Sequence, residues 1–138
     1  MATRRQAREN AFHVVFSQLF TGYGLDLALQ RADQLAEDQR PELDDLARRL
    51  LGHVENHRAR IEECVSGFLK GWTLERLAPT EGALLRLGVA ELLFERDIPP
   101  ASTINEYVEL AKRYGDEKAP GFVNAVLDNV RKAHRADR

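Results

Sequence analysis

The stretch ALLRLGVAELLF, residues Ala83–Phe94, is the most apolar part of this 138-residue sequence. Its leucine and valine side chains recur around most of a helical circumference rather than along one narrow stripe. A helix of this kind needs neighbouring segments that cover it on several sides. The stretch therefore predicts a central helix around which the others pack. Gly82 and Gly88 lack side chains, so they would allow a neighbouring helix to approach closely.

The segments before this stretch also carry helical patterns. Apolar residues recur every three or four positions from Ala7 to Phe20 and from Leu25 to Ala36. Two further stripes lie between Glu42 and Lys70, and they allow either two helices broken near Asn56 or one long bent helix. Alternation typical of strands is not found in the sequence, so the predicted fold class is all-α.

A strongly specified helix is predicted within PPASTINEYVELAKRYG, residues Pro99–Gly115. Ser102 or Thr103 is the expected N-cap, and Glu106 completes a capping box with Thr103. Gly115 is the expected C-terminal stop. The predicted buried stripe consists of Ile104, Tyr107, Val108, Ala111 and Tyr114. The helix that follows is expected to point Val123, Val126, Leu127 and Val130 inward.

Length and composition limit the class of protein. A chain of 138 residues suggests one domain, or two small helical halves that share a core. Its single cysteine, Cys64, excludes an internal disulfide and indicates a reducing compartment. The sequence lacks an apolar run approaching the roughly 18–20 residues of a membrane span. We therefore expect a cytoplasmic protein that does not bind membranes.

Residues with catalytic or metal-binding potential do not form a recognisable motif. His53 and His57 share one helix face and Cys64 follows two turns later, but zinc needs three or four convergent ligands. Solvated histidines and a packed thiol explain these residues better than a metal site does. Phosphate-binding loops, nucleophile elbows and zinc-protease motifs are not found in the sequence. We expect neither an enzyme nor a bound cofactor or metal.

The charge distribution is uneven although the net charge is only −2. Residues 1–25 contain Arg4, Arg5 and Arg8 against a single acid, whereas residues 26–63 contain ten acids against six arginines. Cations at a helix N-terminus oppose the helix dipole. The three arginines therefore indicate either a frayed N-terminus or a site where an anion such as an RNA phosphate compensates them.

Phe122 lies off the apolar stripe of its predicted helix. At about 100° per residue it points roughly 90° away from the centre of that stripe. It also follows a loop, GDEKAPG, rich in residues that favour turns. Two interpretations remain open: Phe122 flanks the core, or it forms an exposed platform on which an unpaired base stacks.

The segment INEYVELAKRYGDEKAPGFVNAVLDNV, Ile104–Val130, resembles the C-terminal signature of the NusB family of transcription antitermination factors. The segments RRQARENAF, LLRLGVAEL and DIPPASTINE fit the same family, so the resemblance covers essentially the whole chain. Two positions depart from the family pattern. Ala125 stands where glycine is common, and Lys118 stands in a loop position that is often acidic, a change that would favour RNA.

The resemblance implies a compact all-α fold of two small helix bundles that share a core. It implies one RNA-binding domain over residues 1–138, with an N-terminal half of about 1–71 and a C-terminal half of about 72–138. Proteins of this family bind the boxA element of nascent ribosomal RNA with the small-subunit ribosomal protein NusE, and they join the RNA polymerase elongation complex. The implied RNA-binding residues are Arg4, Arg5, Arg8, Lys112, Lys118 and Phe122. The implied partner-binding residues are Glu75, Arg76 and Glu81.

Two other functions remain as alternatives. The chain could be a helical protein–protein adaptor without an RNA role. It could also be the NusB-like N-terminal domain of a ribosomal RNA cytosine methyltransferase, although the 138 residues lack the glycine-rich cofactor loop of the catalytic domain. A homodimer that buries the arginine-rich surface would mask RNA binding, and the sequence fits a monomer and a homodimer equally well.

Overall fold

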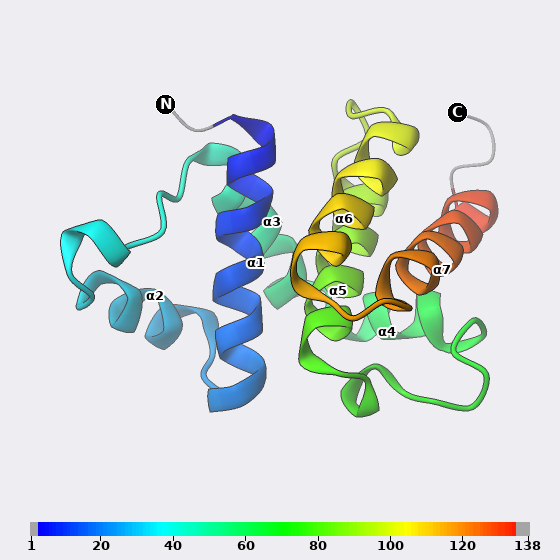
Figure 1. Ribbon diagram of the computed structural model, residues 1–138, viewed down its shortest axis with the longest axis horizontal. Coiled ribbons are helices and arrows are strands. Elements are labelled where there is room, and N and C mark those ends of the chain that lie inside the picture. Colours follow the sequence, from blue (N-terminus) through cyan, green and yellow to red (C-terminus); the bar gives the residue numbers. More distant parts are fainter. Residues whose placement is uncertain (1–2, 135–138) are drawn as a thin grey trace.

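The computed structural model describes residues 3–134, which form seven α-helices and two short 3-10 helices without a strand (Figure 1). The all-α prediction is therefore confirmed. None of the helices in the described part is long and apolar enough to cross a membrane. In chain order the elements are α1 (Arg4–Thr21), α2 (Leu25–Asp33), η1 (Glu37–Gln39), α3 (Asp45–Asn56), α4 (Arg58–Ser66), η2 (Leu74–Arg76), α5 (Pro79–Phe94), α6 (Pro100–Tyr114) and α7 (Ala119–His134).

The apolar helix α5 is central, as its sequence predicts. It packs against α1, α3, α4, α6 and α7. From Gly82 to Leu93 every residue except Arg86 is buried. Gly88 allows α7 to approach closely, because a Cβ atom placed on it would lie 2.8 Å from both terminal methyl carbons of Leu127. The core of the whole fold is thus arranged around one helix.

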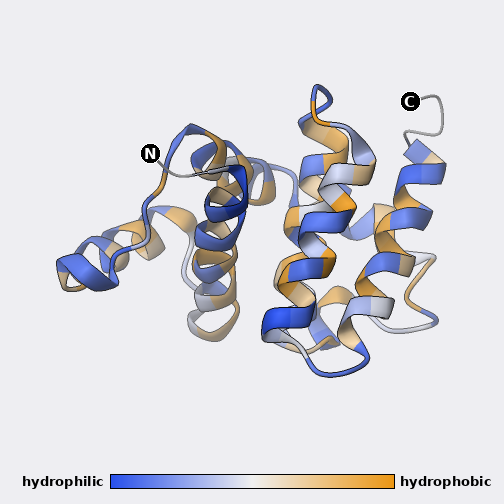
Figure 2. Cartoon of the chain, turned by 45° about the horizontal axis from the view of Figure 1, so that its top comes forward, coloured by the Kyte–Doolittle hydropathy of each residue, from blue (hydrophilic) through white to orange (hydrophobic). Residues whose placement is uncertain are grey.

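The helices form two groups that share this core (Figure 1). In one group α1 packs against α2 and α3, and in the other α5, α6 and α7 pack against one another. Both α1 and α3 also contact α5, so the buried residues form a single cluster that runs through both groups. Orange apolar segments face the spaces between the helices in Figure 2, while blue polar segments face outward. The predicted arrangement of two small bundles with a common core is confirmed.

The structure decides between the two possibilities for residues 42–70. The segment forms two helices, α3 and α4, which are separated at His57. The backbone of His57 leaves the helical region, with φ −128° and ψ 33°. The same residue is the C-cap of α3 and the N-cap of α4, so the break is confined to one position next to Asn56.

The predicted ends of α6 are wrong in detail. The helix begins at Pro100 and has Pro99 as its N-cap, earlier than the expected capping box at Thr103. Proline suits this place, because its fixed φ is helical and its missing N–H is not needed in the first turn. Thr103 is instead buried inside the helix. Gly115 does end α6, but with an extended backbone (φ −94°) and not in the left-handed conformation.

The apolar stripes of α1 and α2 extend beyond the core. At the end of α1, Leu19 is 36% exposed and Phe20 is 67% exposed, although the helical spacing places both on the inward stripe. The expected second stripe runs from Leu25 to Ala36, whereas α2 ends at Asp33 and buries only Ala28. Both helices therefore leave apolar side chains exposed to solvent near their C-terminal ends.

The close contact at Gly88 gives a stability prediction. Gly88→Ala is expected to destabilise the fold by about 1–3 kcal/mol, because the new methyl group overpacks against Leu127. Gly52→Ala is the matched control: Gly52 also lies inside a helix, and a Cβ atom placed on it would meet no atom within 4 Å. The free energy of unfolding of the Gly52→Ala control should rise by about 0.5–1 kcal/mol. Urea unfolding of both variants measures the difference, and equal effects would contradict the packing argument.

Candidate nucleic-acid interface

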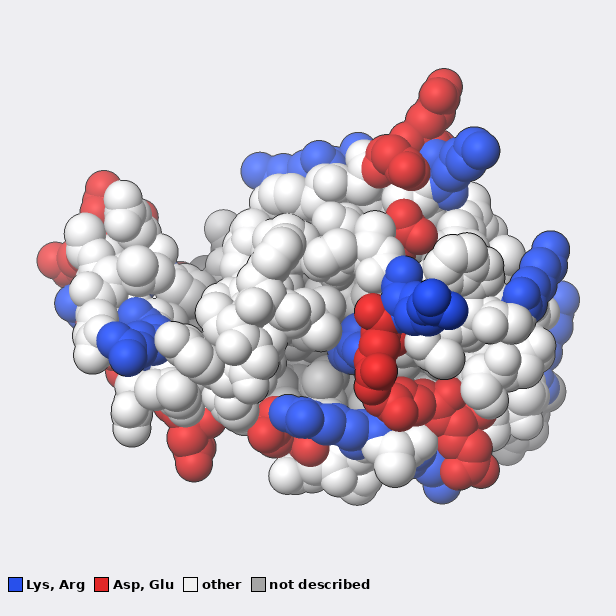
Figure 3. All heavy atoms as spheres, turned by 90° about the horizontal axis from the view of Figure 1, so that it is seen from below, with Lys and Arg blue, Asp and Glu red and all other residues white. Residues whose placement is uncertain are grey.

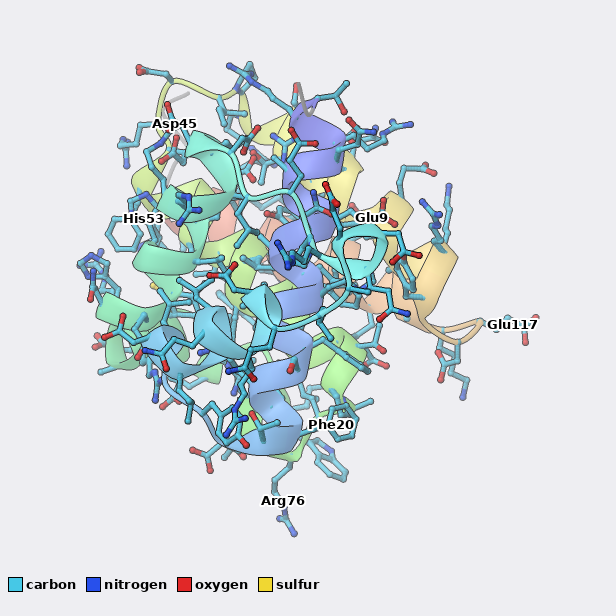
Figure 4. All side chains as sticks on the ribbon, turned by 90° about the vertical axis from the view of Figure 1, so that its left-hand side faces the viewer. Glu9, Phe20, Asp45, His53, Arg76 and Glu117 are labelled. Carbon is cyan, nitrogen blue, oxygen red and sulfur yellow. The ribbon has the colours of Figure 1, made fainter. Side chains whose placement is uncertain are left out.

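Helices α1 and α6 run side by side (Figure 1). Charged side chains connect them. The guanidinium of Arg5 donates two hydrogen bonds to the carboxylate of Glu106, at 2.9 and 3.1 Å. Further along α1, Glu9 accepts a hydrogen bond from the Tyr114 hydroxyl and pairs with Arg113 at 2.8 Å. Figure 4 shows Glu9 on α1 near the middle of the molecule. The pairs follow the same order on both helices, so α1 and α6 are parallel.

Aromatic rings reinforce the same junction. Phe12 stacks on Tyr114 with ring centroids 5.1 Å apart. His13 meets the edge of Tyr114 at 5.3 Å. Phe16 extends the row through contacts with Phe12 and with the exposed ring of Phe20. The row fixes α1 against the last turn of α6.

Arg5 is available to a ligand even though it has a protein partner. Its side chain is 67% exposed, whereas that of Glu106 is 16% exposed. The hydrogen bond and the charge of Arg5 hold the pKa of the Glu106 carboxyl below its ordinary value. Exposed ion pairs contribute little to stability, about 0–1 kcal/mol. The guanidinium can therefore turn from Glu106 to a phosphate at small cost.

Arg4 is exposed and has no charged partner within residues 3–134. It lies in the first turn of α1, where the helix dipole disfavours a cation. The helix start itself is well formed, because Thr3 and Gln6 complete a capping box. The cation is thus held on an ordered helix and is not neutralised.

Arg8 does not lie on this surface. Its side chain is 3% exposed, and its guanidinium donates to the carboxylate of Glu91 on α5, with the shortest contact at 2.7 Å. Thr103 and Tyr107 of α6 donate to the same carboxylate at 2.6 and 3.0 Å. Burial and the charge of Glu91 raise the pKa of Tyr107 well above its ordinary value, so its hydroxyl remains a donor. The expectation that Arg8 faces a ligand is therefore wrong.

This network was not predicted from the sequence, because each of its residues also fits another pattern. Glu91 stands inside the most apolar stretch, where a carboxylate looks like the polar exception on a solvated face. Thr103 looks like a cap, and Arg8 looks like part of a basic cluster. A buried charge needs a partner. Only one feature of the sequence could have indicated this network: Glu91 is an acid within a helix that is predicted to be covered on several sides.

The last turn of α6 and the loop between α6 and α7 carry the remaining basic residues that were predicted to bind RNA. Lys112 is exposed and pairs with Glu109 one turn earlier, at 3.1 Å. Lys118 is exposed, and its ammonium group has no acidic partner in the described part of the chain. The Asp116 carboxylate accepts hydrogen bonds from the backbone N–H groups of Lys118 and Ala119, both at 3.0 Å. These bonds define the loop conformation just before α7.

Phe122 lies in the first turns of α7 and is half-buried against the core. Phe122 therefore flanks the core without being fully enclosed by it, and its role as a platform for an unpaired base stays a prediction. Lys112, Lys118 and Phe122 surround the α6–α7 junction, while Arg4 and Arg5 lie at the start of α1. Helix α6 connects the two groups, since it runs from the partner of Arg5 to Lys112.

The residues predicted to bind a protein partner lie at the other end of α1. Glu75 and Arg76 are exposed in η2, and Glu81 is half-buried in the first turn of α5. Burial, and next the charge of Asp116, raise the pKa of Glu81. The start of α5 therefore lies close enough to the α6–α7 loop for the charge of Asp116 to act on Glu81.

Two exposed aromatic residues near this region were not predicted. Trp72 is 57% exposed and has the guanidinium of Arg76 over its ring, 5.8 Å from the centroid. Phe20 is 67% exposed, and Figure 4 shows Phe20 and Arg76 at the same end of the molecule. A broad uncharged area lies in the middle of this lower face (Figure 3). Exposed aromatic rings next to charged side chains are typical of protein interfaces.

His53 and His57 have structural partners, and Cys64 is buried. His53 bonds to Glu95 at 2.9 Å, and His57 stacks on Phe94 with ring centroids 4.1 Å apart. Within residues 3–134, His, Cys, Asp and Glu side chains do not form a group of three or more that could hold a metal ion.

Comparisons with known proteins agree on one family. The model of the NusB family matches residues 5–132. A transcription antitermination protein NusB from Methylacidiphilum infernorum is 38% identical over 96% of this chain and 92% of its own length. The structure of T. maritima NusB superposes with a TM-score of 0.82 at 36% identity, covering 97% of this chain and 94% of that one. A structure of the antitermination factors NusB and NusE in complex with double-stranded RNA superposes with a TM-score of 0.74 at 30% identity, covering 94% of this chain and 96% of that one.

The two kinds of ion pair at this junction predict different effects on stability. Arg8→Ala leaves Glu91 buried without its cation and is expected to cost about 3–5 kcal/mol. Arg5→Ala is the matched control on the same helix and should change stability little, because its ion pair is exposed to solvent. Replacing both charged partners, as Arg8→Met with Glu91→Gln, should recover part of the loss, because no buried charge remains and the amide oxygen still accepts from Thr103 and Tyr107. Thermal unfolding tests this; similar effects of Arg8→Ala and Arg5→Ala would contradict it.

Proposed function

This chain belongs to the NusB family, and we propose that it is a transcription antitermination factor that binds boxA RNA together with the ribosomal protein NusE. The observation that carries the proposal is the pair of helices α1 and α6, on which exposed cations stand at both ends of one continuous junction. The adaptor and methyltransferase alternatives are not favoured, because the matched relatives are antitermination proteins and a similar protein was solved with NusE and RNA. A catalytic step has no place in this function.

The proposed RNA-binding residues are Arg4, Arg5, Lys112, Lys118 and Phe122. Within residues 3–134, Arg4 and Lys118 have no acidic partner, and Arg5 and Lys112 are themselves exposed in their ion pairs, so all four can contact phosphates. The solvent-facing part of Phe122 can support one stacked base. Arg8 supports the surface from within through Glu91 and does not touch RNA.

The proposed NusE-binding surface comprises Glu75, Arg76 and Glu81, extended by Phe20 and Trp72. The two rings provide exposed apolar area, and the charged residues provide a polar rim. We further propose that the complex acts on the RNA polymerase elongation complex in the cytoplasm. A homodimer that covers α1 would compete with RNA, so the binding-competent form is the monomer.

An RNA titration tests the first surface. Arg5→Ala should weaken binding of a short boxA-like single strand and reduce the slope of log K against log salt by about 0.7. Phe122→Ala should weaken binding about tenfold, because stacking of one base contributes about 1–3 kcal/mol. Arg60→Ala, which removes an exposed arginine on α4, outside the α1–α6 junction, should bind like the parent.

Circular dichroism should show unchanged helicity in all three variants. If Arg5→Ala and Phe122→Ala both bind as well as a parent that binds strongly, the proposed RNA surface is wrong. If the monomeric parent binds no RNA even with the ribosomal protein present, the adaptor function is favoured instead.

A partner titration tests the second surface. Phe20→Ala should weaken binding of the ribosomal protein about tenfold, because exposed aromatic anchors dominate interface energies. Leu27→Ala, which removes another exposed apolar side chain on a different helix, is the control and should have no effect. Isothermal titration calorimetry of each variant with the ribosomal protein measures both, and equal affinities would show that Phe20 lies outside the interface.

A further inference from the structure

The segment formed by α2 and η1 projects from the body of the molecule (Figures 1 and 2). Helix α2 is amphipathic, yet it buries only Ala28. Leu35, at the end of the same apolar pattern, is 43% exposed. An amphipathic helix normally buries its apolar face, so the apolar side of this segment is only partly covered by the chain itself.

A groove lies between this segment and α1. Its volume is about 350 Å³. Its apolar lining consists of Val14, Ala28, Ala32, Leu35 and Pro41. The groove therefore offers aliphatic surface from both α1 and α2, with room for a few aliphatic side chains.

The charged side chains that line the groove are positive. Arg31 and Arg40 belong to the lining, and within the described residues the lining contains no carboxylate. At about 100° per residue, Asp26 and Asp33 point about 140–160° around α2 from Ala28, away from the groove. Titratable His13 also lines the groove from α1, and its ring contacts the Tyr114 hydroxyl at 3.3 Å and the rings of Phe12 and Tyr114.

Both arginines keep donors free. The Nε of Arg40 donates to the carbonyl of Leu35 at 2.9 Å, which holds the guanidinium beside the groove. Arg31 contacts only the side-chain oxygen of Gln34, at 3.4 Å. Neither arginine pairs with a carboxylate in the range 3–134. An incoming acid would therefore meet two unneutralised cations.

The groove uses a different face of α1 from the proposed RNA surface. Asn10, Val14 and Ser17 of α1 line the groove, whereas Arg5 and Glu9 face α6. At about 100° per residue, the centres of these two faces are roughly 125° apart. His13 lies between them, because it lines the groove and also contacts Tyr114 of α6. A ligand in the groove can therefore bind while RNA occupies the α1–α6 junction.

We propose that the α1–α2 groove binds a segment of another protein in which aliphatic side chains are flanked by Asp or Glu. The aliphatic lining fits such side chains, and the two arginines complement the acids. A basic segment would be repelled. RNA fits less well, because unpaired bases prefer aromatic platforms and the lining formed by the described residues contains no Phe, Tyr or Trp ring.

The test uses a displayed library of random 12-residue peptides, selected on the full chain and counter-selected on Ala32→Trp, which fills the groove without adding a charge. We expect enrichment of peptides with Leu, Ile or Val next to Asp or Glu. A synthetic enriched peptide should lose at least about tenfold in affinity on Arg40→Glu, which places two like charges together. A version of the peptide with Lys in place of the acids should then bind Arg40→Glu better than it binds the parent.

Arg48→Glu is the matched control. Arg48 is an exposed arginine whose Nε donates to the carbonyl five residues earlier, at 3.1 Å, as that of Arg40 does. It lies outside the groove lining, so this variant should bind the peptide like the parent. Circular dichroism and thermal unfolding of every variant verify that the fold is intact.

Three results would overturn the proposal. The selection enriches no peptide whose binding is lost on Ala32→Trp, or it enriches basic peptides. The third contradicting result is that Arg40→Glu weakens binding of single-stranded RNA as strongly as Arg5→Ala does. That result would show that the groove binds RNA. Because the peptide is tested without RNA or NusE, failure here is distinct from failure of the proposed antitermination function.

Discussion

The buried ion pair between Arg8 and Glu91 connects the three helices on which the candidate RNA surface depends. Glu91 lies on the central helix α5 and accepts hydrogen bonds from Arg8 of α1 and from Thr103 and Tyr107 of α6. A buried carboxylate that loses one of these donors remains desolvated, so each donor position is strictly defined. The network therefore sets how α1 lies along α6, and with it the place of Arg5 one turn earlier.

Burial separates arginines of the same helix into different roles. Arg8 is enclosed and permanently paired, so it acts on the structure. Arg5 is exposed, and its pair with Glu106 is weak enough to exchange for a phosphate. The arginines at the α1–α2 groove have no acidic partner at all in residues 3–134. Local environment, more than residue type, decides which cations can bind a ligand.

Much of the fold was predictable because local chemistry and tertiary packing agree there. The apolar circumference of Ala83–Phe94 predicted the central helix, and Gly88 predicted a close helix contact. The predictions failed where tertiary contacts use a residue for another purpose. Thr103 fits a capping box by spacing, but its hydroxyl is needed by Glu91 and the prolines start the helix earlier. Phe20 fits the stripe of α1, but its ring is left 67% exposed and contacts Phe16 of the same helix.

The helical class, the central position of α5 and the family could all be recognised in the amino-acid sequence, because hydrophobic periodicity and motif residues are properties of neighbouring positions along the chain. Three features required the folded chain: Arg8 is internal while Arg5 is exposed, His57 divides α3 from α4, and α2 leaves a basic apolar groove beside α1. Burial and charge pairing depend on residues far apart in sequence. Arg8 and Glu91 are 83 positions apart, and periodicity carries no information over that separation.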